Sequence, residues 1–97
     1  MIYNNVILEV NDPANIETVR GHLIELAKAS LEEPGCIKFD VHQSKMNLGL
    51  FFLIEEWESQ DALDFHRGEP AFAEHYLPNV VPLVNRQPHP CGRVWPE

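Results

Sequence analysis

The chain has 97 residues, 44% hydrophobic and 23% charged, a composition that predicts one globular domain over residues 1–97. Its formal net charge of −8 disfavours nucleic acid and anionic membranes as partners, because phosphate groups are bound by clustered Lys and Arg. No apolar run is long enough to span a bilayer and no signal peptide is evident at the N-terminus, so we expect a cytoplasmic protein. Cys36 and Cys91 match no zinc spacing, and we expect two reduced thiols.

The first third of the chain predicts a strand followed by a helix. Residues 3–10 alternate between two faces, one of them apolar, as in a half-buried strand. Asp12 is a suitable N-cap and Pro13 a suitable first helical residue. Apolar side chains then recur at helical spacing to about Leu31, which predicts a helix with one buried face.

Two strands are predicted after the turn at residues 33–35. Residues 36–44 alternate strictly between two faces. One of these faces holds Ile37, Phe39 and Val41. A hairpin loop leads back into residues 50–57, whose unbroken apolar run predicts a strand buried on both faces.

The remainder predicts a helix, a broken helix and a last strand. Ser59 is a suitable N-cap for a helix that ends near Gly68. A further helical piece opens at Pro70 and is interrupted by two prolines. We expect a loop over 85–90 and a short strand over 91–95. The resulting order, β-α-β-β-α-β, predicts an α+β fold of the ferredoxin-like type, an antiparallel sheet with helices on one face.

His66 is the first candidate for chemistry. It falls on or beside the inward face of a helix, at the edge of an apolar space, and its ordinary titration near neutrality suits proton transfer. The alternative is a core histidine whose hydrogen bonds are satisfied within the protein. Tyr76 and Phe72 share the inward face of the next helical piece, and His75 is offset toward the rim.

Three further residues are candidates for a ligand pocket. Trp57 could form a flat wall or pack in the core. One of Asn4 and Asn5 should face inward and must then be hydrogen-bonded, to the protein or to a ligand. The group Lys38, Asp40 and His42 could in principle hold a metal, but without a second ligand cluster we favour a solvated or interfacial face. We therefore expect no metal site.

Several catalytic signals are absent from the sequence. There is no phosphate-binding glycine loop, no dinucleotide fingerprint and no Ser or Cys nucleophile motif. An enzyme built from this chain would have few reactive groups of its own. Its substrate would have to supply the reactivity.

An ordered set of short motifs resembles a known family. These motifs are Glu33-Pro34-Gly35-Cys36, Phe39-Asp40-Val41-His42, the stretch from Phe52 to Ser59, Ala62-Leu63 with His66, and Pro70-Ala71-Phe72. In this order they resemble the antibiotic biosynthesis monooxygenase (ABM) domain family. The resemblance implies a dimeric α+β barrel formed by two sheets packed face to face, with a pocket between sheet and helices in each subunit. Members include cofactor-free monooxygenases of quinols and phenols, haem-degrading enzymes and an isomerase.

The resemblance also suggests roles for individual residues. His66 matches a helix histidine that lines the pocket, Trp57 a common tryptophan, and Asn4 or Asn5 a pocket hydrogen-bond donor. Haem-degrading members have a tryptophan where this chain has His66, and their haem-ligating histidine falls near Tyr76, so haem is disfavoured.

We therefore expect a homodimeric monooxygenase that uses molecular oxygen as co-substrate, needs no cofactor and binds a quinol-like or phenolic small molecule in an aromatic-sized hollow. The alternatives are a non-catalytic dimeric small-molecule-binding or stress-associated protein, and an isomerase of a small polar metabolite that would need cations such as Lys38, Arg67 or Arg93.

Overall fold

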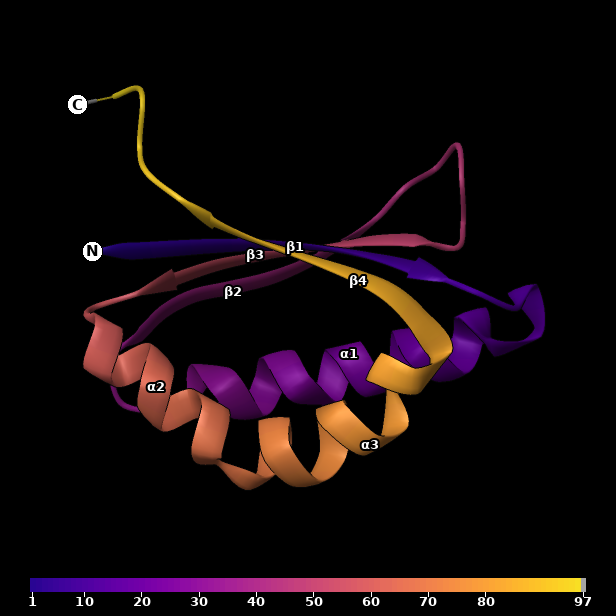
Figure 1. Cartoon of the computed structure of the whole chain (residues 1–97), viewed down its shortest axis with the longest axis horizontal. Helices are drawn as coiled ribbons and strands as arrows, with labels where there is room; N and C mark the ends of the chain where they lie inside the picture. Colours follow the sequence, from indigo (N-terminus) through magenta and orange to yellow (C-terminus); the bar gives the residue numbers. More distant parts are fainter. Residues whose placement is uncertain (97) are drawn as a thin grey trace.

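The computed structural model describes residues 1–96 and contains one four-stranded antiparallel sheet with helices on one face (Figure 1). The strands are β1 (Ile2–Val10), β2 (Cys36–Gln43), β3 (Leu50–Trp57) and β4 (Val84–Cys91), in the spatial order β2-β3-β1-β4. The helices are α1 (Ile16–Leu31), α2 (Gln60–Gly68) and α3 (Leu77–Asn79). The predicted ferredoxin-like α+β fold is confirmed.

Shorter helical segments complete the helical layer. A 3-10 turn, η1 (Pro13–Asn15), precedes α1, and η3 (Val81–Leu83) leads into β4. Between α2 and α3 lies a π-helical segment, η2 (Ala71–Tyr76). The helical stretch after Pro70 is therefore broken, as its prolines predicted, and a π-helical turn often marks a functional position.

The predicted helix starts are also confirmed. The Asp12 side chain accepts a hydrogen bond from the Ala14 amide at 2.9 Å, which caps η1. The Ser59 hydroxyl accepts one from the Ala62 amide at 3.2 Å, which caps α2. Each cap satisfies an amide that has no partner within the helix.

The core lies between the helices and one face of the sheet. Strands β1 and β3 contribute alternate residues to it, and α1 packs its apolar stripe against them. The buried apolar side chains are Val6, Leu8, Val10, Val19, Leu23, Leu26, Phe39, Phe51, Leu53, Trp57, Leu63, Tyr76, Val80 and Val84. The opposite face of the sheet has no helix over it (Figure 1).

Two predictions about the hairpin strands were wrong. Strand β3 is buried on one face only, because its alternate residues, among them Phe52, point to the face that no helix covers. In β2 the alternation is interrupted by a bulge between Cys36 and Lys38. Ile37 is the extra residue in this bulge, and it is 48% exposed instead of sharing the inward face with Phe39.

The end of the chain also differs from the prediction. Residues 85–90 were expected to form a loop, with a strand at 91–95, but β4 runs from Val84 to Cys91. Pro88 and Pro90 are tolerated because β4 is an edge strand that pairs only with β1, so amide hydrogens are needed on one side only. Trp95 lies beyond the strand and is 81% exposed.

Candidate functional site

A small cavity lies between the sheet and the helical layer. Its volume is about 10 Å³, close to the space that one water molecule requires. Every strand and the α1, α2 and η2 segments contribute side chains to it. The lining residues are Asn4, Leu26, Phe39, Leu53, Glu55, Leu63, His66, Arg67, Phe72, Tyr76 and Arg86. Polar and ionisable groups therefore meet at this point in an otherwise apolar core.

His66 comes from α2 and is 2% exposed. Its ring lies 4.5 Å from the Trp57 ring and 5.2 Å from the Phe72 ring, measured between centroids. Nδ1 is 2.6 Å from Glu33 Oε1. Burial lowers the pKa of His66 and outweighs the opposing effect of the nearby Glu55 carboxyl. The imidazole is therefore held in its neutral form at neutral pH.

Glu55 on β3 is a buried carboxyl beside this histidine. It is 4% exposed. Its Oε1 accepts hydrogen bonds from Trp57 Nε1 at 3.0 Å and from Asn4 Nδ2 at 3.4 Å. Burial raises the pKa of Glu55, and the two donors and the positive charge of Arg86 oppose the rise.

The side chain of Asn4 has one hydrogen-bonding atom without a partner among the described residues. While Nδ2 donates to Glu55, the buried Oδ1 has no partner within residues 1–96. Leaving a buried acceptor unpaired costs about 1–3 kcal/mol. A hydroxyl donor that reached Oδ1 from the cavity would recover that energy.

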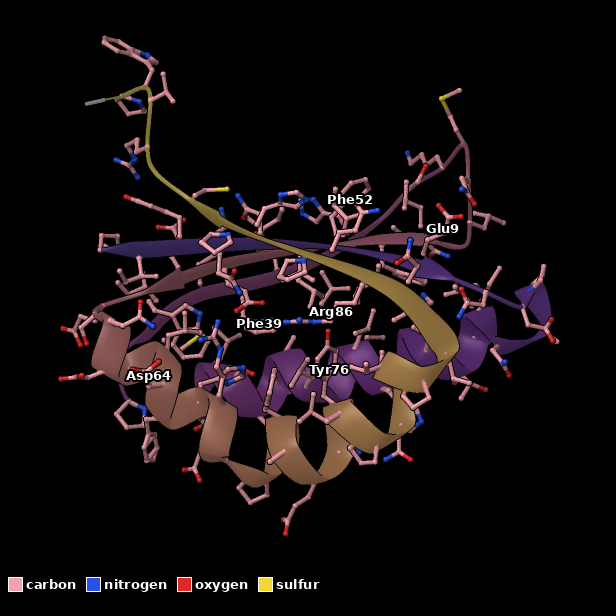
Figure 2. All side chains as sticks on the ribbon, in the orientation of Figure 1. Glu9, Phe39, Phe52, Asp64, Tyr76 and Arg86 are labelled. Atoms are coloured by element: carbon pink, nitrogen blue, oxygen red, sulfur yellow. The ribbon has the colours of Figure 1, made fainter. Side chains whose placement is uncertain are left out.

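Tyr76 from η2 and Arg86 from β4 form the other side of the site. Figure 2 shows the two side chains pointing toward each other between the sheet and the helices. Arg86 Nε donates to the Tyr76 hydroxyl oxygen at 3.0 Å. Burial raises the pKa of Tyr76, so the phenol keeps its proton at neutral pH. The tyrosine can accept from Arg86 and still donate its own proton to an oxygen in the cavity.

Five of the seven residues predicted for the site lie together. Asn4, His66, Phe72 and Tyr76 line the cavity, and Trp57 packs against His66 behind them. Of the two asparagines left open by the sequence, Asn4 is the one that faces inward.

Asn5 and His75 do not reach the cavity. Asn5 is on the other face of β1, where its amide contacts Cys91 Sγ at 3.4 Å. His75 Nε2 lies 3.0 Å from His22 Nδ1 in a contact between η2 and α1. The geometry therefore supports no role for either residue in this cavity.

Three important residues were missed by the sequence analysis. Glu55 could have been found, because strict alternation in β3 places it on the same face as Leu53 and Trp57. Arg86 was assigned to a loop, and its position depends on the unpredicted strand β4. Glu33 meets His66 through a contact between residues 33 positions apart, which no local pattern reveals.

This cavity is too small to be the expected hollow for an aromatic guest. A cavity that binds benzene has a volume of about 150 Å³, whereas this one has about 10 Å³. Phe39 and Phe72 occupy the space between the layers. A ring-sized ligand would have to displace a lining side chain.

Two of the three predicted cations lie outside the cavity, and the predicted metal ligands form no cluster in the described residues. Lys38 pairs with Asp40 at 3.6 Å and with Glu56 at 3.9 Å, and Arg93 lies over the Tyr3 ring. Arg67 alone of the three predicted cations lines the cavity. Within residues 1–96, no group of three or more His, Cys, Asp or Glu side chains could hold a metal ion. In the same part of the chain, no helix is long and apolar enough to cross a membrane.

Comparison with known proteins matches the amino-acid sequence to one family. The family model described as antibiotic biosynthesis monooxygenase matches residues 1–76. The chain belongs to the ABM family. The match includes every cavity residue except Arg86. No curated protein matches the chain.

Several solved structures share the ABM fold. A conserved protein of unknown function from Bacteroides thetaiotaomicron, suggested to be an oxidoreductase, is 28% identical, with 93% of this chain and 94% of that chain covered and a TM-score of 0.86. A candidate antibiotic biosynthesis monooxygenase from Nitrosomonas europaea is 18% identical, with 98% and 92% covered and a TM-score of 0.84. A similar candidate from Deinococcus radiodurans is 20% identical, with 96% and 94% covered and a TM-score of 0.81. The last two likenesses concern the fold alone.

Proposed function

We propose that the protein is an ABM-type oxidoreductase, a monooxygenase that acts without a cofactor on a small quinol-like or phenolic molecule, with molecular oxygen as co-substrate. The observation that carries the proposal is the convergence of Asn4, His66 and Tyr76 on one cavity. Family membership supports an oxidoreductase in general terms. The finer assignment rests on the chemistry of these side chains.

The arrangement suits a substrate that brings its own reactivity. The unpaired Oδ1 of Asn4 needs a donor, which a phenolic hydroxyl supplies. A neutral His66 can take the proton of that hydroxyl, and Tyr76 can donate to a second substrate oxygen. An electron-rich phenolate can pass an electron directly to oxygen. The protein then has only to bind, deprotonate and orient its substrate.

Haem is not part of this proposal. The Tyr76 hydroxyl is engaged by Arg86, and His75 lies outside the cavity in contact with His22. A titration with haem that produced no Soret band would agree with the proposal, and a saturable Soret band would contradict it.

We also propose that the protein works as a homodimer in the cytoplasm. Ile7, Phe52 and Ile54 form an apolar strip on the sheet face that no helix covers, and each of them is half-buried. Figure 2 shows Phe52 on this face, away from Tyr76 and Arg86. A second copy packed on the strip would remove it from water.

Oxygen consumption with a panel of small hydroquinones and polyhydroxylated phenols tests the activity. We expect turnover that needs neither metal nor flavin and that falls at least about 100-fold in His66→Gln, because general base catalysis contributes about 10²–10⁴-fold. His22→Gln, on α1 and in contact with His75 outside the cavity, is the matched control and should keep the wild-type rate. An unchanged rate in His66→Gln would remove the role given to His66.

A second candidate function is favoured by the size of the cavity. With a volume of about 10 Å³, the cavity holds no ring-sized molecule unless a lining side chain moves, which favours a non-catalytic protein that binds its small molecule elsewhere. Thermal-shift screening separates the two proposals. Phenols that raise the melting temperature without oxygen uptake would favour the non-catalytic protein.

A further inference from the structure

Glu33 lies in the turn between α1 and β2 and reaches the histidine of a different helix. Its Oε1 is 2.6 Å from His66 Nδ1, and the two side chains are 10% and 3% exposed. When Glu33 is ionised, a contact this short to a ring N–H is a charge-assisted hydrogen bond. Within residues 1–96, this is the only hydrogen bond that the His66 ring makes.

The turn that carries Glu33 is held in place on both sides. The Glu33 amide donates to the Ser30 carbonyl at 3.0 Å, and the Cys36 amide donates to the Glu33 carbonyl at 3.3 Å. Gly35 has a φ of 83°, and a Cβ placed there would lie 2.5 Å from Ala62 Cβ at the start of α2. The turn therefore packs directly on the helix that carries His66, and its position fixes the distance from Glu33 to the ring.

The hydrogen bond determines which nitrogen of His66 can act. A carboxylate accepts only, so it selects the tautomer in which Nδ1 carries the proton. Nε2 then presents a lone pair and has no partner within the described chain, while the ring itself lines the cavity. The free lone pair is what a general base needs.

We propose that Glu33 is the positioning residue of His66: it holds the imidazole in the Nδ1–H tautomer, so that Nε2 accepts the proton of a ligand hydroxyl, and it stabilises the imidazolium that results. The proposal rests on the proposed function. In the step, the ligand O–H bond breaks and an N–H bond forms at Nε2. The ligand becomes an oxyanion, the ring becomes a cation next to the Glu33 carboxylate, and the proton later returns to an oxygen of the product.

The charges around the pair predict a dependence on pH. Burial, with the nearby charge of Glu69, raises the pKa of Glu33 to about 7. The charges of Glu55 on β3 and Arg67 on α2 also act on the pKa of His66, the first raising it and the second lowering it, and the Cys36 thiol lies near Glu33. Below about pH 7 a protonated Glu33 would donate to Nδ1 and leave a proton on Nε2, which removes the base. Turnover should therefore rise with pH through about 7.

The tautomer can be measured without any substrate. In the full-length protein with ¹⁵N-labelled histidine, long-range ¹H–¹⁵N correlation spectra at pH 8.5 distinguish the two neutral tautomers, and the spectrum of His66→Gln assigns the His66 signals among the five histidines. We expect the Nδ1–H tautomer in the wild type and a shift toward Nε2–H in Glu33→Ala. Glu69→Gln is the control that keeps the tautomer. An Nε2–H tautomer in the wild type, or no change in Glu33→Ala, would overturn the proposal.

A second measurement tests the consequence for catalysis. With a phenol that the wild type turns over, Glu33→Gln should lower kcat about tenfold or more with little change in KM, and the rise of rate through about pH 7 should disappear. An unchanged kcat and pH profile would overturn the positioning role. If the wild type turns over no phenol at all, the proposed function fails, while the tautomer spectra still decide whether Glu33 orients His66.

Discussion

Replacing Glu33 by glutamine should change how the stability of the protein depends on pH. The pKa of Glu33 is raised from 4.5 to about 7 in the folded protein, chiefly by burial and then by the charge of Glu69. The folded state therefore holds this proton more tightly than the unfolded chain does. The stability that the protonated carboxyl contributes is complete below pH 4.5 and is lost as the pH rises through about 7.

The size of the expected change in stability follows from the shift in the pKa of Glu33. Each pKa unit corresponds to about 1.4 kcal/mol, so the rise from 4.5 to about 7 sets an upper bound of roughly 3 kcal/mol. The turn at Glu33 borders solvent, which screens the charged form, and we reduce the expected change to about 1–2 kcal/mol. The side chain introduced by Glu33→Gln cannot ionise, so the variant lacks this dependence.

Urea unfolding at half-unit steps from pH 5 to pH 8 measures the difference. The free energy of unfolding of the wild type minus that of Glu33→Gln should fall by about 1–2 kcal/mol across this range. The raised pKa of Glu55 acts with the same sign and the lowered pKa of His66 with the opposite sign. The subtraction removes the Glu55 contribution to first order, whereas the His66 contribution changes with the substitution because His66 is bonded to Glu33.

A control separates the local effect from net charge. Glu17→Gln, at the opposite end of α1, changes the net charge by the same amount away from the pair. The free energy of unfolding of the wild type minus that of Glu17→Gln should stay constant over the same pH range. A wild-type minus Glu33→Gln difference that is constant or grows with pH would refute the argument that the fold stabilises the protonated carboxyl.

Three further predictions concern packing and assembly. Gly35→Ala should lower the free energy of unfolding, measured in urea, by about 2 kcal/mol or more, because φ is 83° and the added Cβ would lie 2.5 Å from Ala62 Cβ. Gly21→Ala should raise the free energy of unfolding by about 0.5–1 kcal/mol, because Gly21 lies in a helix with open space around it. Equal effects would contradict the packing argument. Phe52→Glu should convert a dimer to a monomer in sedimentation experiments, while Leu77→Glu, exposed on the helical side, should not; a wild type that sediments as a monomer would end the dimer proposal. Phe72→Ala should cost about 2 kcal/mol in stability, less than a fully buried Phe, because Phe72 is half-buried. It should also give a larger thermal shift with hydroquinone than the wild type, because it enlarges the cavity; a smaller shift would show that this ring does not close the site.

The fold was predictable wherever a local pattern carried it. Ser59 and Asp12 were identified as caps because their position before an apolar periodic stretch has a direct physical meaning, and both make the expected hydrogen bonds. Strand β4 was missed because prolines in a sequence argue against a central strand, and only the sheet order reveals that the strand lies at an edge. The one-sided burial of β3 likewise depends on where the helices lie.

The candidate site was predictable only in part, for the same reason. Helical periodicity shows which side chains share the inward face of a helix, and it placed His66, Tyr76 and Phe72 correctly. The partners that determine their chemistry come from distant parts of the chain: Glu33 reaches His66 from a turn, and Arg86 reaches Tyr76 from β4. The volume of the cavity depends on how all the lining side chains pack, which no single pattern encodes.

The two open edges of the sheet are unsuited to further backbone pairing. The β4 edge offers no amide hydrogen at Pro88 and Pro90. At the β2 edge, the bulge at Ile37 interrupts the regular spacing that an incoming strand would need to match. Both edges of the sheet therefore disfavour the strand-to-strand pairing on which fibrils grow. The apolar sheet face can then remain available to a specific partner without edge-to-edge association of further chains.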